Sequence, residues 1–201
     1  MIGFVRGVLV AKRAPSLLID VQGLGYEVDA PMSTFYNLPE IGTEVRLYTH
    51  LQVREDAHSL FGFGTEAERS LFRSLIRVSG IGAKLALTIL SGISVDDFRA
   101  CVERQDSARL VRLPGIGKKT AERLIIELRD RLDLGAPSLV PAAFAGGAAP
   151  VLSADPADEA VSALIALGFK PQEASTLVAK QSTEGRSAED LIRLALQSAV
   201  R

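Results

Sequence analysis

A short phrase built around two glycines occurs twice in the middle of this 201-residue chain. Residues 78–84 read VSGIGAK and residues 113–119 read LPGIGKK, so both glycines and the isoleucine between them recur 35 residues later. Glycine tolerates a positive φ, so each Gly-Ile-Gly can turn sharply, and apolar residues at helical spacing stand on both sides of it. The sequence therefore predicts an internal repeat of helix, tight turn and helix.

Each predicted turn is a candidate phosphate site. The helix after the turn points its first free N–H groups back at it, the helix end is partly positive, and glycine lets a phosphate approach closely. Two such turns can hold a duplex backbone without reading its bases. For an isolated copy, a plain connection between two helices is an equally good interpretation. The candidate DNA-phosphate residues are Ser79, Gly80, Ile81, Gly82, Lys84, Pro114, Gly115, Ile116, Gly117, Lys118, Lys119 and Arg123.

Charge is segregated along the chain rather than abundant. The formal net charge is −1 and the pI is about 6.2. Residues 69–95 and residues 107–121 nevertheless each contain four basic residues and no acidic one. Together with the repetition, this favours the phosphate interpretation and predicts one face for nucleic acid and other faces for different partners.

Length and composition favour a globular protein of one large domain or two to three small ones, since 47% of the residues are hydrophobic. The most apolar stretch, 139–152, is interrupted by proline and glycine, so we expect a cytoplasmic protein without a membrane partner. Cys101 has no second cysteine to pair with and falls in a helical pattern, which predicts a buried structural thiol.

The pattern divides the chain into four parts with an overall α+β architecture. Residues 1–64 favour five short strands and have the size of an OB-like β-barrel, although another small β fold is equally allowed. Helical periodicity predicts a tandem helix-hairpin-helix domain over 65–134, and an Ala-, Pro- and Gly-rich stretch predicts a flexible linker over 135–155. Three short helices are expected in a small domain over 156–201. The expected strands are 2–10, 17–21, 25–30, 45–53 and 59–63.

The last domain is predicted to bind protein rather than nucleic acid. From residue 135 onward the chain has five basic and seven acidic residues, so its net charge is negative. An apolar contact at a helix end could come from Leu164, Leu167, Gly168 and Phe169. These residues are equally well interpreted as the core of a small three-helix domain.

The sequence indicates no catalytic residue and no cofactor. Gly117-Lys118-Lys119-Thr120 fails the ATP-binding phosphate-loop pattern, because Lys119 stands at the hydroxyl position and Arg112 at the first glycine position. His50 and His58 are isolated, and no Cys/His cluster has the spacing of a transition-metal site. We expect a binding protein without a metal.

With its barrel, tandem turns and small last domain, the chain resembles the RuvA family of Holliday-junction branch-migration proteins. The resemblance covers almost the whole chain and includes LALTILSG at 85–92, LPGIGKKTAERL at 113–124 and ALGFKP at 166–171. The second phrase is shared with many helix-hairpin-helix proteins, whereas the combination is specific.

The resemblance implies a homotetramer that holds a four-way DNA junction open, with hairpins on the minor-groove backbones of the arms. Glu55 and Asp56 match the acidic pin of the family, and Arg54 beside them would be a basic residue at the junction centre. Taken alone, two acids at a hairpin tip are an ordinary turn. The last domain would dock RuvB, a hexameric ATPase that supplies the motor. One or two tetramers on the junction, and a RuvC-type resolvase as a further partner, both stay open.

Two other classes of function compete with this one. DNA glycosylases of the helix-hairpin-helix superfamily carry a phrase like that at 113–121, but they need a catalytic Asp in a larger helical domain that accepts a flipped base. A generic single-stranded-DNA barrel needs stacking aromatics, and the few available ones must also build the core. Release of a base from lesion-containing duplex would identify the glycosylase.

Overall fold

The computed structural model describes residues 1–132, 155–181 and 186–199. It forms two compact units, Met1–Ala136 and Pro137–Arg201, each of which is described by itself. The predicted α+β architecture is confirmed: a barrel precedes a helical region in the first unit, and helices make up the second. Most of the predicted linker at 135–155 lies outside the described residues.

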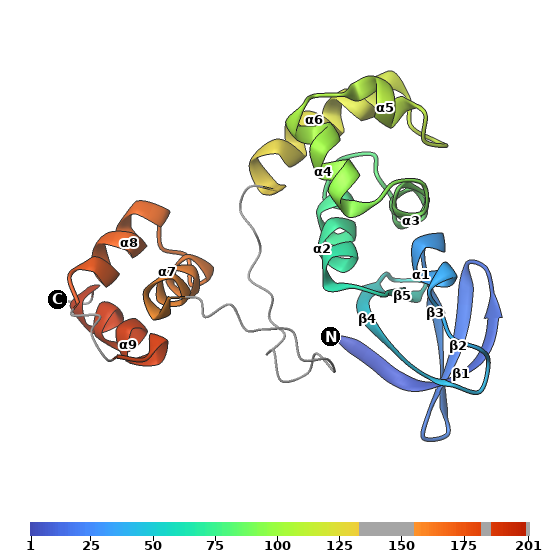
Figure 1. Cartoon of the computed structure of the whole chain (residues 1–201), viewed down its shortest axis with the longest axis horizontal. Helices are drawn as coiled ribbons and strands as arrows, with labels where there is room; N and C mark the ends of the chain where they lie inside the picture. The colour runs from blue at the N-terminus through green and yellow to red at the C-terminus, as the bar shows by residue number, and fades with distance from the viewer. Residues whose placement is uncertain (133–154, 182–185, 200–201) are drawn as a thin grey trace. The chain divides into compact units, whose positions relative to one another are not determined.

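The N-terminal region is a closed five-stranded barrel with the strand order β1-β2-β3-β5-β4 (Figure 1). Neighbouring strands are antiparallel except β3 and β5, which meet in parallel at Asp29 and Phe61. Alternation along β4 puts Val45, Leu47 and Thr49 inside the barrel, as expected for strands with one buried face. The strands are β1 (Phe4–Arg13), β2 (Ser16–Val21), β3 (Leu24–Asp29), β4 (Glu44–Val53) and β5 (His58–Phe63).

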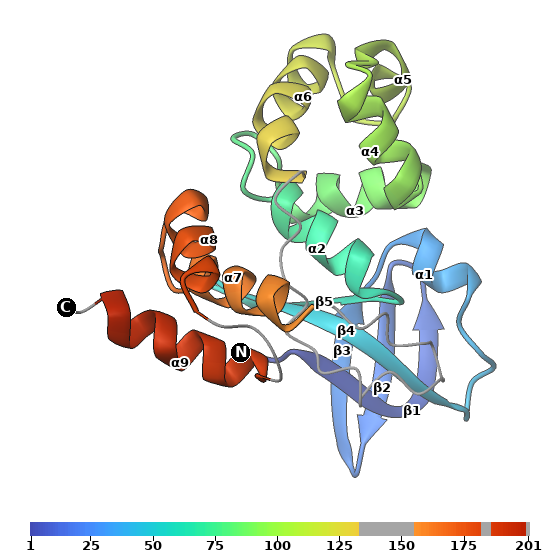
Figure 2. The same cartoon turned by 60° about the vertical axis from the view of Figure 1, so that its left-hand side comes forward.

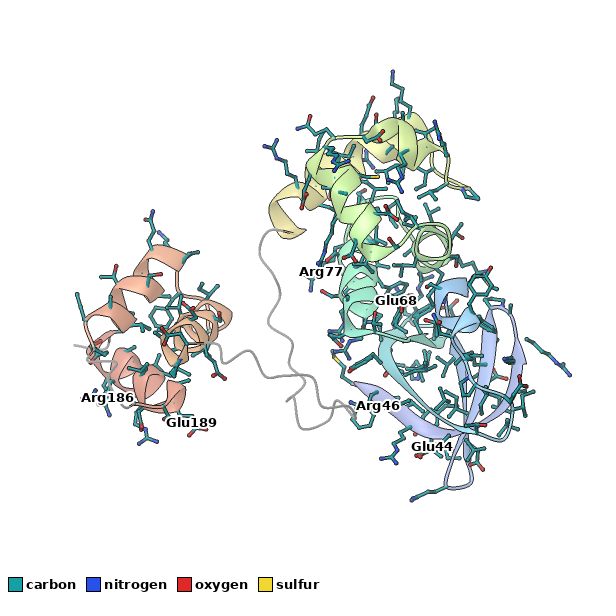
Figure 3. The ribbon with its side chains drawn as sticks, in the orientation of Figure 1. Glu44, Arg46, Glu68, Arg77, Arg186 and Glu189 are labelled. Carbon is teal, nitrogen blue, oxygen red and sulfur yellow. The ribbon has the colours of Figure 1, made fainter. Side chains whose placement is uncertain are left out.

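The outer face of β1 and β4 has its own side-chain contacts. Arg46 lies over the ring of Phe4, with its guanidinium carbon 4.7 Å from the ring centroid. Glu44, labelled with Arg46 in Figure 3, forms an ion pair with Arg6 across the two strands. On this face Arg46 is therefore attracted to an aromatic ring and Arg6 to a carboxylate.

The helical region of the first unit follows the barrel directly. One short helix, α1 (Met32–Tyr36), was not predicted and lies between β3 and β4. In Figure 2, α2 and α3 lie next to the barrel and α4 to α6 lie beyond them. A continuous core of buried apolar residues runs from Phe61 in the barrel to Leu128 in α6. The helices are α2 (Glu66–Leu75), α3 (Ala83–Gly92), α4 (Val95–Glu103), α5 (Ser107–Val111) and α6 (Lys118–Leu132).

Two charged residues at the start of α2 attach the helices to the barrel. Glu68, labelled in Figure 3, caps its own helix in a capping box with Thr65 and also accepts hydrogen bonds from Ser33 of α1 and from the Gly64 amide. Arg69 is only 4% exposed and donates to the Gly3 carbonyl at 2.6 Å. The polar contacts thus bind α2 to α1 and to the residue just before β1.

The second unit contains α7 (Pro156–Ala166), α8 (Pro171–Ala179) and α9 (Ala188–Ala199). Proline at the first position starts α7 and α8, where its missing N–H costs no helical hydrogen bond. Ser187 caps α9 by accepting from the Asp190 amide. The small core of the second unit comprises Ala160, Leu164, Ala174, Val178, Leu191 and Ala195.

Candidate nucleic-acid interface

The two repeated phrases fold into two turns of the same type, which we call the first turn (residues 78–81) and the second turn (residues 113–116). In the first, the Ile81 amide donates to the Val78 carbonyl at 3.0 Å; in the second, Ile116 donates to Leu113 at 3.2 Å. The third residue of each turn is a glycine with a positive φ, +87° at Gly80 and +81° at Gly115. This combination is the signature of a type II β-turn. The glycines are needed because L side chains are strained at such φ values.

A helix begins immediately after each turn without a side chain over its end. Gly82 precedes α3 and accepts from the Ala86 amide, and Gly117 precedes α6 and accepts from the Ala121 amide. By contrast, α4 is capped by Ser94 and α5 by Asp106. Glycine has no side chain to occupy the first free N–H groups of α3 and α6, so these donors are open to an anion.

The side chains of the two turns divide between core and solvent. Ile81 and Ile116 are buried, each 5% exposed, so that only their backbones can reach a ligand. Ser79, Lys84, Pro114, Lys118 and Lys119 are exposed. Each turn therefore combines an anchored backbone with exposed cations at the start of the following helix, which is suited to an extended polyanion rather than to a small buried ligand.

Arg123 is placed differently from the lysines. Its Nη1 donates to the Ser79 carbonyl at 2.9 Å, although the two residues are 44 positions apart. The helix that follows the second turn therefore contacts the first turn. No sequence pattern predicts this hydrogen bond, because nothing in the spacing of the two copies indicates how they pack against each other.

An acidic residue that sequence reasoning missed lies close to Lys84. Burial raises the pKa of the Asp29 carboxyl, with Glu27 adding to this shift and the charge of Lys84 opposing it. Asp29 ends β3, more than fifty residues before Lys84 in the chain. The acid-free stretch around the first turn is thus acid-free in sequence but has a carboxyl near it in space.

Not every basic residue of the two acid-free stretches belongs to a cationic surface. Arg69 is buried and forms an ion pair with Glu66, and Arg109 forms one with Asp97 at 2.8 Å. Arg73 and Arg77 lie on and just after the last turn of α2, where Figure 3 labels Arg77. The local positive charge comes from fewer residues than the count in the sequence suggests.

The adjacent acids Glu55 and Asp56 lie at the tip of the hairpin between β4 and β5. The Arg54 amide donates to the Ala57 carbonyl at 2.9 Å and closes the turn, leaving Arg54, Glu55 and Asp56 exposed. Among the described residues, neither carboxylate has a hydrogen bond or an ion pair. Both carboxylates are therefore available to interact with another molecule.

The four candidate docking residues of the last domain do not share one environment. Leu164 is fully buried in the core, and Phe169 packs partly against it. Leu167 is 63% exposed, and Gly168 follows it with a φ of +101° that ends α7. Leu167 is thus available to a partner, whereas Leu164 has a structural role.

The described residues were also compared with the requirements of a metal site and of a membrane-spanning helix. No group of three or more His, Cys, Asp or Glu side chains that could hold a metal ion occurs among them. None of the described helices is long and apolar enough to cross a membrane.

Comparison with known proteins identifies similar sequences along the whole chain. Three family models match: the RuvA N terminal domain at residues 1–62, the SAM-like helix-hairpin-helix tandem at 72–130 and the RuvA C-terminal domain at 155–200. The chain is 90% identical to the Holliday junction branch migration complex subunit RuvA of Methylococcus capsulatus, over 100% of both chains. It is 57% identical to the subunit of the same name from Thioalkalivibrio sulfidiphilus, also over 100% of both. The Pseudomonas aeruginosa PAO1 subunit is 53% identical over 100% of both.

Proposed function

Because the chain belongs to the RuvA family, we propose that it binds four-way DNA junctions by their shape, without reading base sequence, as part of a branch-migration complex. In this proposal the chain acts as a homotetramer that holds the junction open. A RuvB-type hexameric ATPase supplies the motor, so the chain itself has no catalytic role. The compartment we propose is the cytoplasm, because the substrate is chromosomal DNA.

The observation that carries the proposal is the pair of matching type II turns, each followed by an uncapped helix and exposed cations. Backbone N–H groups at a helix start bind phosphate whatever the base beside it. Branch migration moves every base pair of an arm past the same contacts, so contacts that ignore sequence keep the energy of each step nearly the same.

In the proposed tetramer the exposed acids of the β4–β5 hairpin would act on the DNA. Glu55 and Asp56 in four copies around one axis would place up to eight negative charges close together, and two like charges about 4 Å apart repel by about 1 kcal/mol in water. Phosphates at the junction centre would be repelled in the same way. We infer that the acids keep the strands apart at the centre while Arg54 beside them attracts the backbone.

For the motor, we propose docking on the last domain around Leu167. Leu167 is 63% exposed at the end of α7, so its apolar side chain is available for contact with a protein partner. Phe169 would complete the contact from the edge of the core, and Leu164 would hold the helix in place.

The proposal is tested by measuring binding of the full chain to a synthetic four-way junction and to a linear duplex containing the same sequences. We expect tighter binding to the junction, equal affinity for two junctions of unrelated sequence, and native masses of four or eight chains per junction. Equal affinity for junction and linear duplex, or a single chain per junction, would refute it.

A further inference from the structure

The two turns are ordered by different means. In the second turn, Pro114 occupies the position after Leu113 and fixes its own φ near the value that a type II turn requires. Ser79 occupies the matching position in the first turn and has no such restriction. The first turn is therefore less well determined by its own residues than the second.

Arg123 compensates for the missing proline. A type II turn directs the carbonyl of its second residue away from its own internal hydrogen bond, and in the first turn this carbonyl belongs to Ser79. The Arg123 guanidinium donates to that oxygen at 2.9 Å, and a Cβ on Gly80 would lie 3.6 Å from the same nitrogen. A charged donor makes this hydrogen bond stronger than one between neutral groups.

A second contact joins the two copies in the opposite direction, from α3 to the second turn. A Cβ on Gly115 would lie 3.0 Å from Leu85 Cδ1, so the helix after the first turn packs against the second turn. The residue matching Arg123 in the first copy is Thr88, whose hydroxyl donates to the Lys84 carbonyl within its own helix. The arginine contact thus runs only towards the turn that lacks proline.

We propose that Arg123 is a positioning residue that holds the first turn in its type II form and at a fixed place relative to the second turn. Its function is then to make the two phosphate sites act on one duplex as a preorganised pair, not to bind a phosphate itself. This inference rests on the proposed function of the two turns and changes the role that the sequence predicted for Arg123.

The first test compares Arg123→Met with Arg129→Met, which removes the same charge from an exposed position further along α6. For Arg123→Met we expect a loss of duplex affinity of about tenfold, the size of one charged hydrogen bond, at every salt concentration. The slope of log affinity against log salt should match that of Arg129→Met. A slope lower by a further ~0.9 would mean that Arg123 neutralises a phosphate and would overturn the proposal.

The second test is rescue by proline. Pro114 in the second turn demonstrates that a turn of this type accepts proline at its second position. Ser79→Pro in the first turn should therefore restore most of the affinity lost in Arg123→Met, whereas Ser79→Ala should restore none. If Ser79→Pro fails to restore binding while the double variant keeps the stability of Arg123→Met, the turn is not what Arg123 controls and the proposal is wrong.

The third test needs no DNA and separates this inference from the proposed function. Amide hydrogen exchange of Ile81, whose N–H closes the first turn, should accelerate at least severalfold in the free Arg123→Met protein, with Ile116 of the second turn unchanged. Unchanged exchange at Ile81 would refute the positioning role. Accelerated exchange without any change in DNA affinity would instead refute phosphate binding by the first turn.

Discussion

The most direct perturbation of the proposed interface is removal of the two lysines that begin α6. Lys118 and Lys119 are both exposed at the start of the helix after the second turn. Each phosphate that a protein cation neutralises contributes about 0.9 to the slope of log affinity against log salt. Lys118→Ala with Lys119→Ala should therefore flatten this slope by up to about 1.8 for each copy of the second turn that engages the duplex.

The slope converts into an affinity change that can be measured. A rise from 50 to 200 mM salt is about 0.6 log units, so the wild-type protein should lose about twelvefold more affinity over this range than the double variant. Fluorescence anisotropy with a labelled duplex and a labelled four-way junction at several salt concentrations measures both slopes. Two junctions of unrelated sequence should lose equal affinity, because phosphate contacts do not read bases.

Arg129→Ala is the matched control for net charge. Arg129 is an exposed cation on the same helix, ten residues after Lys119 and thus about 15 Å along the axis. It should change the slope little. An unchanged slope in the lysine double variant would refute phosphate binding at the second turn. An equal fall of the slope in Arg129→Ala would show that overall charge, and not the second turn, causes the effect.

Three further changes have defined outcomes. Glu55→Gln with Asp56→Asn should keep or raise affinity for linear duplex in gel-shift titrations and change the rate of motor-driven branch migration; if neither changes, the acids are an ordinary turn. Gly115→Ala should lower the free energy of unfolding in urea by about 1–2 kcal/mol, because its φ of +81° is strained for alanine, and a loss below about 0.5 kcal/mol would contradict this. Burial lowers the pKa of His50, and the charges of Arg73, Arg69 and Arg77 lower it further, so folding favours the neutral ring. The free energy of unfolding should therefore fall as the pH drops below 6.5, where the His50 side chain of the unfolded chain takes up a proton. Urea unfolding between pH 5 and 8 should show a weaker pH dependence in His50→Gln, and equal dependence would exclude this residue as the cause.

Local sequence patterns predicted those parts of the molecule in which neighbouring residues decide the conformation. Pro114-Gly115 specifies a type II turn almost by itself, since proline and glycine supply the two backbone angles required. Alternation over residues 44–49 of β4 likewise decides which side chains enter the barrel. Ser94 and Ser187 cap the starts of α4 and α9 through hydrogen bonds within three residues in the sequence.

Contacts between distant segments could not be predicted from these patterns. The carboxyl of Asp29 near Lys84 and the hydrogen bond from Arg123 to Ser79 depend on how elements pack, and no local periodicity encodes that. The basic residues of the two acid-free stretches were counted alike, yet Arg69 is buried, with partners in the Gly3 carbonyl just before β1 and the Glu66 carboxylate of α2. A count of charge in a sequence is an upper limit on surface charge for this reason.

The attachment of α2 to the barrel bears on how this chain would transmit the force of a motor in the proposed complex. In the proposed tetramer, the acids at the β4–β5 tip set where strands separate and the two turns set where the arms lie, so the work of a motor is useful only if these distances hold. Glu68 and Arg69 join α2 to α1 and to Gly3 just before β1 through hydrogen bonds to side-chain and backbone groups, and the apolar core continues from Phe61 into the helices. A buried arginine that loses its acceptors leaves an uncompensated charge, so sliding α2 along the barrel is opposed by far more than the loss of one surface contact. In the proposed complex the barrel and the turns would therefore move together under the load of the motor, with the strain falling on the DNA.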